Sequence, residues 1–166
     1  IYADLGNYCK KISNNLPVLI SPYIDGVKNI SQYTSSVKKG RSISIDDHFK
    51  EWEKIFSGIK GAVDIVAFQD GHVNYDQLLD FIKVNKELAD NNNIESWINT
   101  ETFDRDMPIK FLPIKWDKLK YKLDIASKAG IKEAITFEFS HFMSPQSSYI
   151  QANHLYNRYM DYIKKR

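Results

Sequence analysis

The chain has 166 residues, of which 43% are hydrophobic and 13% are aromatic, and its lysines and arginines (23) nearly balance its aspartates and glutamates (21). This length fits one domain of the usual size, roughly 100 to 200 residues, and the apolar content excludes disordered and collagen-like classes. The formal net charge of +2 is far from the strongly basic balance of proteins that bind phosphate backbones, so we expect no nucleic-acid partner. The single cysteine, Cys9, cannot form an internal disulfide. No apolar run approaches the roughly 18 residues of a membrane span.

Apolar segments of strand length alternate with longer segments of helical period, which is typical of βα units around a parallel sheet. We expect a helix over residues 3–13. Four strands follow, each rich in Ile, Val and Phe and ending in polar residues, over 16–23, 63–70, 94–101 and 134–140. Near-continuous apolar runs suit strands that are buried on both faces.

The segments between the predicted strands carry apolar stripes at helical spacing. The first runs from Phe49 to Ile59, with Ser44 and Asp47 as a capping box and Gly61 as a stop signal. Three further stripes follow, from Leu78 to Ala89, from Trp116 to Ala126 and from Ile150 to Ile163. Residues 24–45 form one long polar loop, either functional or a plain surface excursion. The order predicts one α/β domain over residues 1–166, with four parallel strands that are each followed by a helix.

The carboxyl ends of the predicted strands carry many polar residues, whereas the amino ends are mostly apolar. In parallel βα architectures the working residues gather at the carboxyl ends, since the βα loops meet there. These ends comprise Ser21, Pro22 and Tyr23; Gln69, Asp70 and Gly71; Asn99, Thr100 and Glu101; and Glu138, Ser140 and His141. We therefore expect a functional site at this edge of the sheet.

Strand alternation assigns these side chains to faces. It predicts that the side chains of two strands point into the same interior: Trp97, Asn99 and Glu101 from one strand, and Thr136, Glu138 and Ser140 from the next. It also predicts that Ile135, Phe137 and Phe139 face the helices. A carboxylate buried in a strand costs several kcal/mol unless it is paired or hydrogen-bonded, so the two glutamates suggest a function. Glycoside hydrolysis uses such a pair, one as acid and one as base or nucleophile. Alternatively, a buried glutamate anchors loop amides or an arginine.

The other candidates are weaker individually. Asp70 precedes Gly71, and Asp-Gly pairs are ordinary turn formers. A histidine such as His141 or His72 suits sugar binding or acid–base work, yet a lone histidine near a loop is usually a surface residue. Aromatic rings at strand ends stack well on sugars, with core packing as the alternative, and here these rings are Tyr23, Trp97, Phe103 and Phe142.

Several local motifs for other chemistries are missing from the sequence. It contains no Gly-rich phosphate loop, G-x-S-x-G elbow, H-E-x-x-H or C-x-x-C motif. Nucleotide, serine-hydrolase and zinc-thiolate mechanisms therefore lack their signatures. We expect neither a cofactor nor a metal.

Four phrases together resemble a bacterial family of inferred glycoside hydrolases, known mainly as a domain of unknown function with a TIM-barrel fold. They are PVLISPYIDG (17–26), DIVAFQDG (64–71), WINTETF (97–103) and TFEFSHFMSP (136–145), and they span nearly the whole chain. The resemblance implies a (β/α) barrel whose strand ends line a carbohydrate groove. It implies Glu101 as the catalytic carboxylate, and as pocket groups Asp70, Gln69, Tyr23, Glu138 and His141. It also implies a secreted or cell-surface setting.

Members of this family look like complete eight-stranded barrels, so the resemblance implies that this chain is the C-terminal half of a (β/α)8 barrel and a fragment of a larger domain. Four βα units cannot close an eight-stranded ring, and an open sheet exposes two edges and an apolar inner face. We expect either pairing with a second copy or completion by a missing amino-terminal half. His72 and Val73 depart from the family, where a further small residue would be expected after Gly71.

The leading hypothesis is a glycoside hydrolase-like domain that acts on a polysaccharide or glycan. Glu101 is the expected nucleophile or base, and Glu138 and Asp70 are the expected accompanying carboxylates. The predicted substrate-binding residues are Tyr23, Gln69, Trp97, Asn99, Phe103, Ser140 and His141. The alternative is a non-catalytic carbohydrate-binding or accessory module of a cell-surface or exopolysaccharide system. A ligand-free scaffold domain is a third hypothesis, favoured if the strand-end polar groups are fully consumed by one another's hydrogen bonds.

Overall fold

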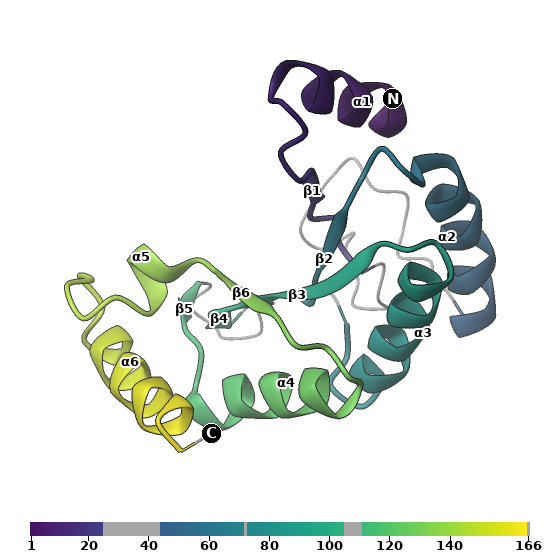
Figure 1. Cartoon of the computed structure of the whole chain (residues 1–166). Coiled ribbons are helices and arrows are strands. Elements are labelled where there is room, and N and C mark those ends of the chain that lie inside the picture. Colours follow the sequence, from purple (N-terminus) through teal and green to yellow (C-terminus); the bar gives the residue numbers. More distant parts are fainter. Residues whose placement is uncertain (25–43, 72, 105–110, 166) are drawn as a thin grey trace.

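A computed structural model of the chain describes residues 1–24, 44–71, 73–104 and 111–165. Its centre is a parallel four-stranded sheet in the order β1 (Leu19–Ile20), β2 (Ile65–Gln69), β3 (Glu95–Glu101) and β6 (Ala134–Phe137) (Figure 1). Helices α2 (Ile45–Ile59), α3 (Leu78–Asn91) and α4 (Trp116–Lys128) follow the first three strands. The predicted α/β class and the four parallel strands are confirmed.

The long helices form where the apolar stripes predicted them, and local signals mark their ends. The Ser44 side chain accepts a hydrogen bond from the Asp47 N–H at 3.0 Å, as expected for the α2 cap. Gly61 and Gly130 have positive φ values of 80° and 85° shortly after α2 and α4. Helix α1 (Tyr2–Ile12) precedes the first strand, and α6 (Ile150–Ile163) ends the chain.

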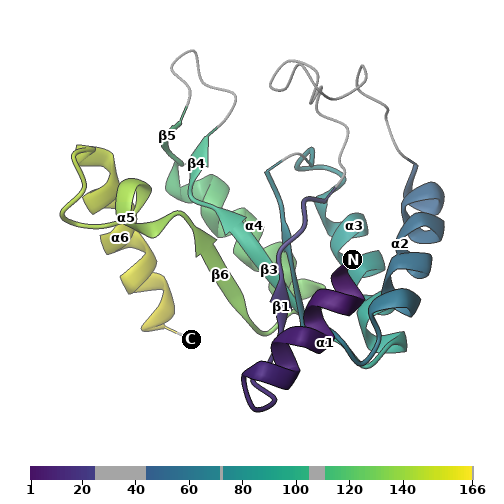
Figure 2. The same ribbon diagram turned by 90° about the horizontal axis from the view of Figure 1, so that it is seen from above.

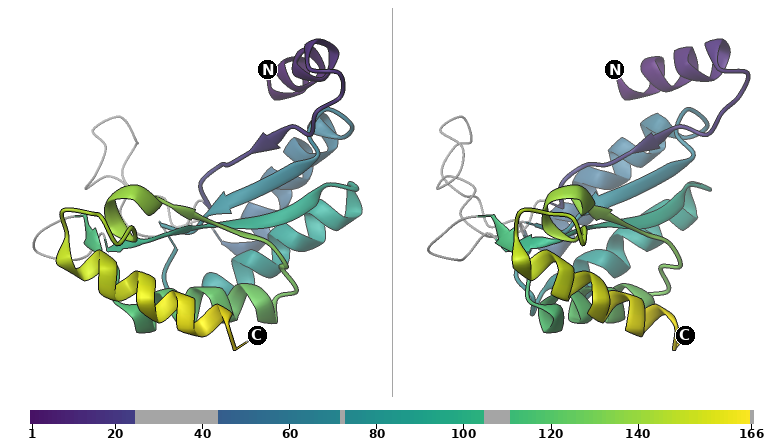
Figure 3. Two further views of the ribbon diagram at one scale, coloured as in Figure 1. Left: turned by 60° about the vertical axis from the view of Figure 1, so that its left-hand side comes forward. Right: turned by 90° about the vertical axis from the view of Figure 1, so that its left-hand side faces the viewer.

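One face of the sheet packs on helices α2, α3 and α4, and in Figures 2 and 3 these helices lie on the same side of the strands. Val66, Phe68 and Ile98 belong to the buried cluster that also contains Phe56 of α2 and Phe81 of α3. Burial of each such side chain contributes about 1.5 to 3 kcal/mol to folding. Because strand residues alternate, the intervening residues face the other side, which we call the open face. Its members include Leu19, Ile65, Ala67, Gln69, Trp97, Asn99 and Glu101.

The register of β6 corrects the face assignment made from sequence. Glu101 pairs with Phe137, and Thr100 pairs with Thr136, so Phe137 shares the open face with Glu101. The expectation that Thr136 shares the face of Glu101, and that Phe137 faces the helices, is wrong. Alternation orders the residues within one strand, but only the pairing between strands relates the faces of two strands.

Strand β6 is also shorter than predicted. It ends at Phe137, and Glu138 then caps the short helix α5 (Phe139–Phe142). The prediction that Glu138 and Ser140 are inward-facing strand residues is therefore wrong. The side chain of Glu138 accepts from the N–H of His141, which stabilises a helical turn at this point.

Two further differences concern short elements. The first strand has only Leu19 and Ile20, although an isolated parallel bridge joins Tyr23 to Gln69 further along. An antiparallel pair, β4 (Phe103–Asp104) and β5 (Leu112–Pro113), was not predicted because two-residue strands leave no periodicity. Most of the predicted loop over 24–45, and His72, lie outside the described residues. Among the helices that the structure describes, none is long and apolar enough to cross a membrane.

Candidate functional site

Four predicted site residues lie together at the carboxyl ends of β1, β2 and β3. Tyr23 bridges to Gln69, Gln69 pairs with Asn99, and Glu101 follows Asn99 on the same face of β3. Ser21 joins these ends, because Gln69 Nε2 donates to the Ser21 carbonyl at 2.7 Å and Asn99 Nδ2 donates to Ser21 Oγ at 2.8 Å. The open face therefore carries a group of polar, hydrogen-bonded side chains at the edge where the sequence predicted a site.

Some buried polar atoms of β3 on the open face have no hydrogen-bond partner. Asn99 is 6% exposed, and its Oδ1 makes no hydrogen bond. Trp97 Nε1 is likewise buried and unsatisfied. Buried polar atoms are nearly always bonded to protein, water or ligand, so an acceptor and a donor remain to be filled on the open face.

The side chain of Glu101 lies almost fully inside the protein. The residue is 1% exposed, and its carboxyl group lies directly over the α-carbon of Gly71. A Cβ atom built at Gly71 would come within 2.1 Å of the Glu101 carboxyl carbon and oxygens. Only glycine at this position leaves room for the carboxylate, which explains the Asp-Gly pair at the end of β2.

Asp70 holds the backbone of Glu101 in place through a hydrogen bond. Its Oδ1 accepts from the Glu101 N–H and from Lys122 Nζ, both at 3.0 Å, and its side chain is 0% exposed. Burial raises the pKa of Asp70, while the Lys122 ammonium and the hydrogen bonds act in the opposite direction. The Oδ2 atom of Asp70 is buried without a hydrogen bond. Asp70 thus holds the end of β3, in contact with a buried charge on α4.

Lys122 is the residue of this site that the sequence interpretation missed. Its side chain is 6% exposed and also reaches the carbonyl of Glu101 at 3.4 Å. A signal was present, because Lys122 occupies the helical stripe that contains Leu119, Leu123 and Ala126. A lysine at a buried stripe position requires a partner, and carboxylates at nearby strand ends are the obvious candidates.

Glu138, Ser140 and His141 form a separate and more exposed cluster on α5. Glu138 Oε1 accepts from Ser140 Oγ and from the His141 N–H, and Oε2 pairs with His141 Nδ1. The hydrogen bond from Ser140 is the main cause that lowers the pKa of Glu138. Desolvation opposes this shift, and the hydrogen bonds from His141 add to it. Thr102, which follows Glu101, donates through Oγ1 to the Glu138 carbonyl at 3.0 Å. The cluster therefore adjoins the end of β3.

The aromatic candidates have different environments. Phe103 is 4% exposed and packs against the rings of Phe142 and Phe111, with centroids 5.0 and 5.3 Å away. Tyr23 and Phe137 are each 47% exposed. Within the described ranges, no three histidine, cysteine, aspartate or glutamate side chains are grouped to hold a metal ion.

A solved structure described as a "putative alpha-L-fucosidase" from Bacteroides thetaiotaomicron is 53% identical, with a TM-score of 0.89 over 99% of this chain. The match covers 51% of that chain, so the protein described here spans about half the length of its solved relative. No curated protein matches the chain. The family model described as "Domain of unknown function (DUF4434)" matches residues 1–149, and the chain therefore belongs to the DUF4434 family.

Proposed function

We propose that this chain forms part of a glycoside hydrolase that acts on a glycan, with Glu101 as its nucleophile or general base. The observation that carries the proposal is the Glu101 carboxylate, held at the carboxyl end of β3 against Gly71. Strand-end carboxylates are the usual catalytic groups of parallel βα enzymes that cleave sugars. The solved relative, described as a "putative alpha-L-fucosidase", supports the same reaction class and makes fucosides the first substrates to test.

The unfilled polar atoms of the open face support a sugar-binding role. A sugar hydroxyl both donates and accepts, so it can donate to Asn99 Oδ1 or accept from Trp97 Nε1. Tyr23 presents a half-exposed ring beside Gln69, suited to stacking on a sugar face. Because Asn99 Oδ1 remains unsatisfied, the polar groups do not consume one another fully, and this observation argues against a ligand-free scaffold.

The other two carboxylates take different roles in this proposal. Asp70 is a positioning residue, because its bonded oxygen is occupied by the Glu101 N–H and by Lys122. Glu138 is kept ionised by the hydrogen bonds from Ser140 and His141. It therefore suits electrostatic stabilisation or sugar binding better than proton donation. The exposed His141 ring pairs with Glu138 through Nδ1 and belongs to the same exposed cluster beside the end of β3.

The proposal places this chain as the C-terminal half of an eight-stranded (β/α) barrel. Two observations support it: the four parallel strands follow one another in chain order, and the solved relative continues well beyond the match. The second catalytic carboxylate would then come from outside this chain. Either the remaining half of a longer polypeptide or a second copy would complete the ring.

The test is glycoside cleavage by the complete protein with Glu101→Gln, beside Glu95→Gln as a matched control. Glu95 lies at the exposed amino end of the same strand. Loss of a catalytic carboxylate should lower kcat at least about 100-fold, since acid–base groups contribute roughly 10²- to 10⁴-fold. Glu95→Gln should retain wild-type kcat. Undiminished kcat in Glu101→Gln would contradict the proposed role.

A second candidate is a carbohydrate-binding module without catalysis. The near-complete burial of Glu101 favours it, because a catalytic group must reach the substrate. A glycan array that shows binding, combined with no release of reducing sugar at any pH, would support this alternative. In that case Asn99→Ala should abolish binding while Glu95→Gln leaves it unchanged.

A further inference from the structure

A surface cavity of about 380 Å³ lies between α6 and the junction of β5 with α4. Residues 113–117 form one wall, and one face of α6 forms the other. Figure 1 shows α6 beside the segment that joins β5 to α4. Pockets for small molecules usually measure roughly 300 to 1,000 Å³, so the cavity is large enough to hold one.

The wall formed by α6 combines polar and apolar side chains. Gln151, His154, Leu155 and Arg158 are spaced by three or four residues and therefore share one face of the helix. Leu155 is 2% exposed and belongs to the buried cluster that also contains Leu119 of α4, whereas the three polar residues are exposed. The cavity thus has an apolar base and polar side chains at its opening.

The opposite wall adds a second cation and an aromatic ring. Lys115 is exposed and occupies the cap position of α4, and a lysine side chain cannot accept from the first N–H groups of the helix. The half-buried Trp116 ring packs edge-on against Tyr162 of α6, with centroids 5.5 Å apart. Among the described residues of the lining, Asp117 is the one carboxylate, against Lys115 and Arg158. The lining therefore carries a net positive charge even before His154 is counted.

We propose that this cavity binds a polar molecule of about the size of a monosaccharide that carries an oxyanion, namely a carboxylate, sulfate or phosphate group. The Arg158 guanidinium and the Lys115 ammonium bind the oxyanion through charge-assisted hydrogen bonds. Gln151 and His154 bond to hydroxyl groups of the ligand, and the Trp116 ring packs against its apolar face. A cavity of this volume exceeds the needs of a bare ion, which favours a larger anionic molecule.

The cavity is separate from the polar group on the open face, although the two are close along the chain. The Ile114 N–H donates to the Thr102 carbonyl at 2.9 Å, and Thr102 directly follows Glu101. Ile114 therefore lines the cavity while its backbone bonds to the end of β3. Because none of the residues assigned to glycan cleavage lines the cavity, the proposal does not depend on glycosidase activity.

The test is a titration of the complete protein, followed in amide NMR spectra, with glucose 6-phosphate, glucuronate, inorganic phosphate and glucose. The two anionic sugars should shift the Trp116 and Asp117 amide signals and reach saturation. Arg158→Gln should raise their Kd at least about fivefold, since hydrogen bonds between charged groups contribute roughly 1.5 to 3 kcal/mol. Inorganic phosphate should bind at least about fivefold more weakly than glucose 6-phosphate, because it lacks the ring contacts. Glucose should cause no saturable shift.

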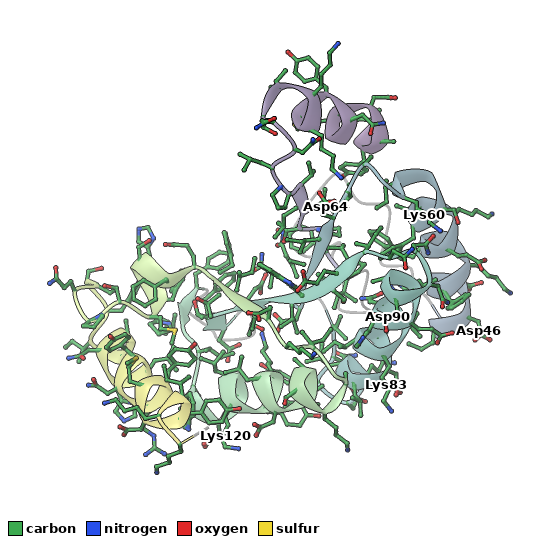
Figure 4. All side chains as sticks on the ribbon, viewed as in Figure 1. Asp46, Lys60, Asp64, Lys83, Asp90 and Lys120 are labelled. Carbon is green, nitrogen blue, oxygen red and sulfur yellow. The ribbon has the colours of Figure 1, made fainter. Side chains whose placement is uncertain are left out.

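Lys120→Gln is the matched control, because it also removes one positive charge near the contact between α4 and α6. Lys120, labelled in Figure 4, lies with its Nζ 5.8 Å from the centre of the Tyr162 ring and outside the cavity lining. This variant should retain the wild-type Kd. Lys120 and Arg158 are both exposed, so both variants should fold.

Four results would overturn the proposal. Equal weakening by Arg158→Gln and Lys120→Gln would show diffuse attraction of anions to a basic surface. Glucose binding as tightly as glucose 6-phosphate would remove the need for an oxyanion. Inorganic phosphate binding as tightly as glucose 6-phosphate would assign the cavity to a free ion. The last is the absence of saturable shifts at Trp116 and Asp117 with either anionic sugar. No readout involves glycoside cleavage, so failure of the proposed activity leaves this test intact.

Discussion

Two groups of polar residues at the same edge of the sheet are held in place by different means. Asp70 follows β2 directly, Glu101 ends β3 and Lys122 lies on α4, and each of the three is at most 5% exposed. Glu138, Ser140 and His141 all come from one short turn, and the His141 side chain is 70% exposed. The first group depends on tertiary packing, whereas the second is assembled by local hydrogen bonds.

This difference determines what each group can do. A buried ion pair loses solvation that its attraction barely restores, so Asp70–Lys122 adds little net stability but becomes costly when one partner is removed. It is suited to fixing the backbone of Glu101. The exposed cluster gains little from its ion pair because water screens the charges. It is suited to contact with a ligand and to tolerance of substitution.

The largest expected effect is the loss of one partner of the buried pair. Lys122→Met leaves the Asp70 carboxylate buried without its cation, and should lower the free energy of unfolding by about 3 to 5 kcal/mol. Urea denaturation at neutral pH measures this change. Because Asp70→Asn removes the charge that Lys122 balances, the double variant Asp70→Asn/Lys122→Met should recover part of the loss.

The control for this prediction lies on the same helix. Lys120 pairs with Asp124 at the surface, and the two side chains are 47% and 39% exposed. Lys120→Met should change the free energy of unfolding by less than about 1 kcal/mol, as exposed pairs do. Equal effects of the substitutions at Lys120 and Lys122 would contradict the contrast between the two groups.

The next effect concerns the space above Gly71. Gly71→Ala introduces a methyl group where the Glu101 carboxyl group lies, and should destabilise the fold by about 1 to 3 kcal/mol through overpacking. Gly58→Ala is the matched control, because nothing lies within 4 Å of a Cβ atom on this helical residue. That substitution should raise stability by about 0.4 to 1 kcal/mol. Thermal unfolding should therefore give a lower Tm for Gly71→Ala and a higher Tm for Gly58→Ala than for the wild type.

The sequence predicted what depends on local pattern. Apolar stripes located α2, α3, α4 and α6, and Ser44 marked the start of α2, because helix periodicity and capping are properties of neighbouring residues. The strand-end rule brought Tyr23, Gln69, Asn99 and Glu101 to one edge of the sheet. Such inferences need only the order of elements and the alternation within each strand.

Features that depend on contacts between distant segments were missed. The pairing of Glu101 with Phe137 reversed the predicted faces of the last strand, because register is set by tertiary packing. The partnership of Lys122 with Asp70 spans 52 positions. Glu138 lies outside the last strand because its carboxylate accepts local hydrogen bonds from Ser140 and His141. A pattern of apolar residues does not predict such hydrogen bonds.

The smallest expected effect is the titration of the exposed cluster. Hydrogen bonds from Ser140 and His141 lower the pKa of Glu138 in the folded chain, so its stabilising contribution is present above the ordinary carboxyl pKa. That contribution is lost as the pH falls through the lowered value. Carbon NMR of the Glu138 carboxyl group should show a titration midpoint below the ordinary glutamate value, and Ser140→Ala should move it upward. A midpoint that does not respond to Ser140→Ala would show that the local hydrogen bonds do not hold this carboxylate, and the contrast with the buried group would then lose its physical basis.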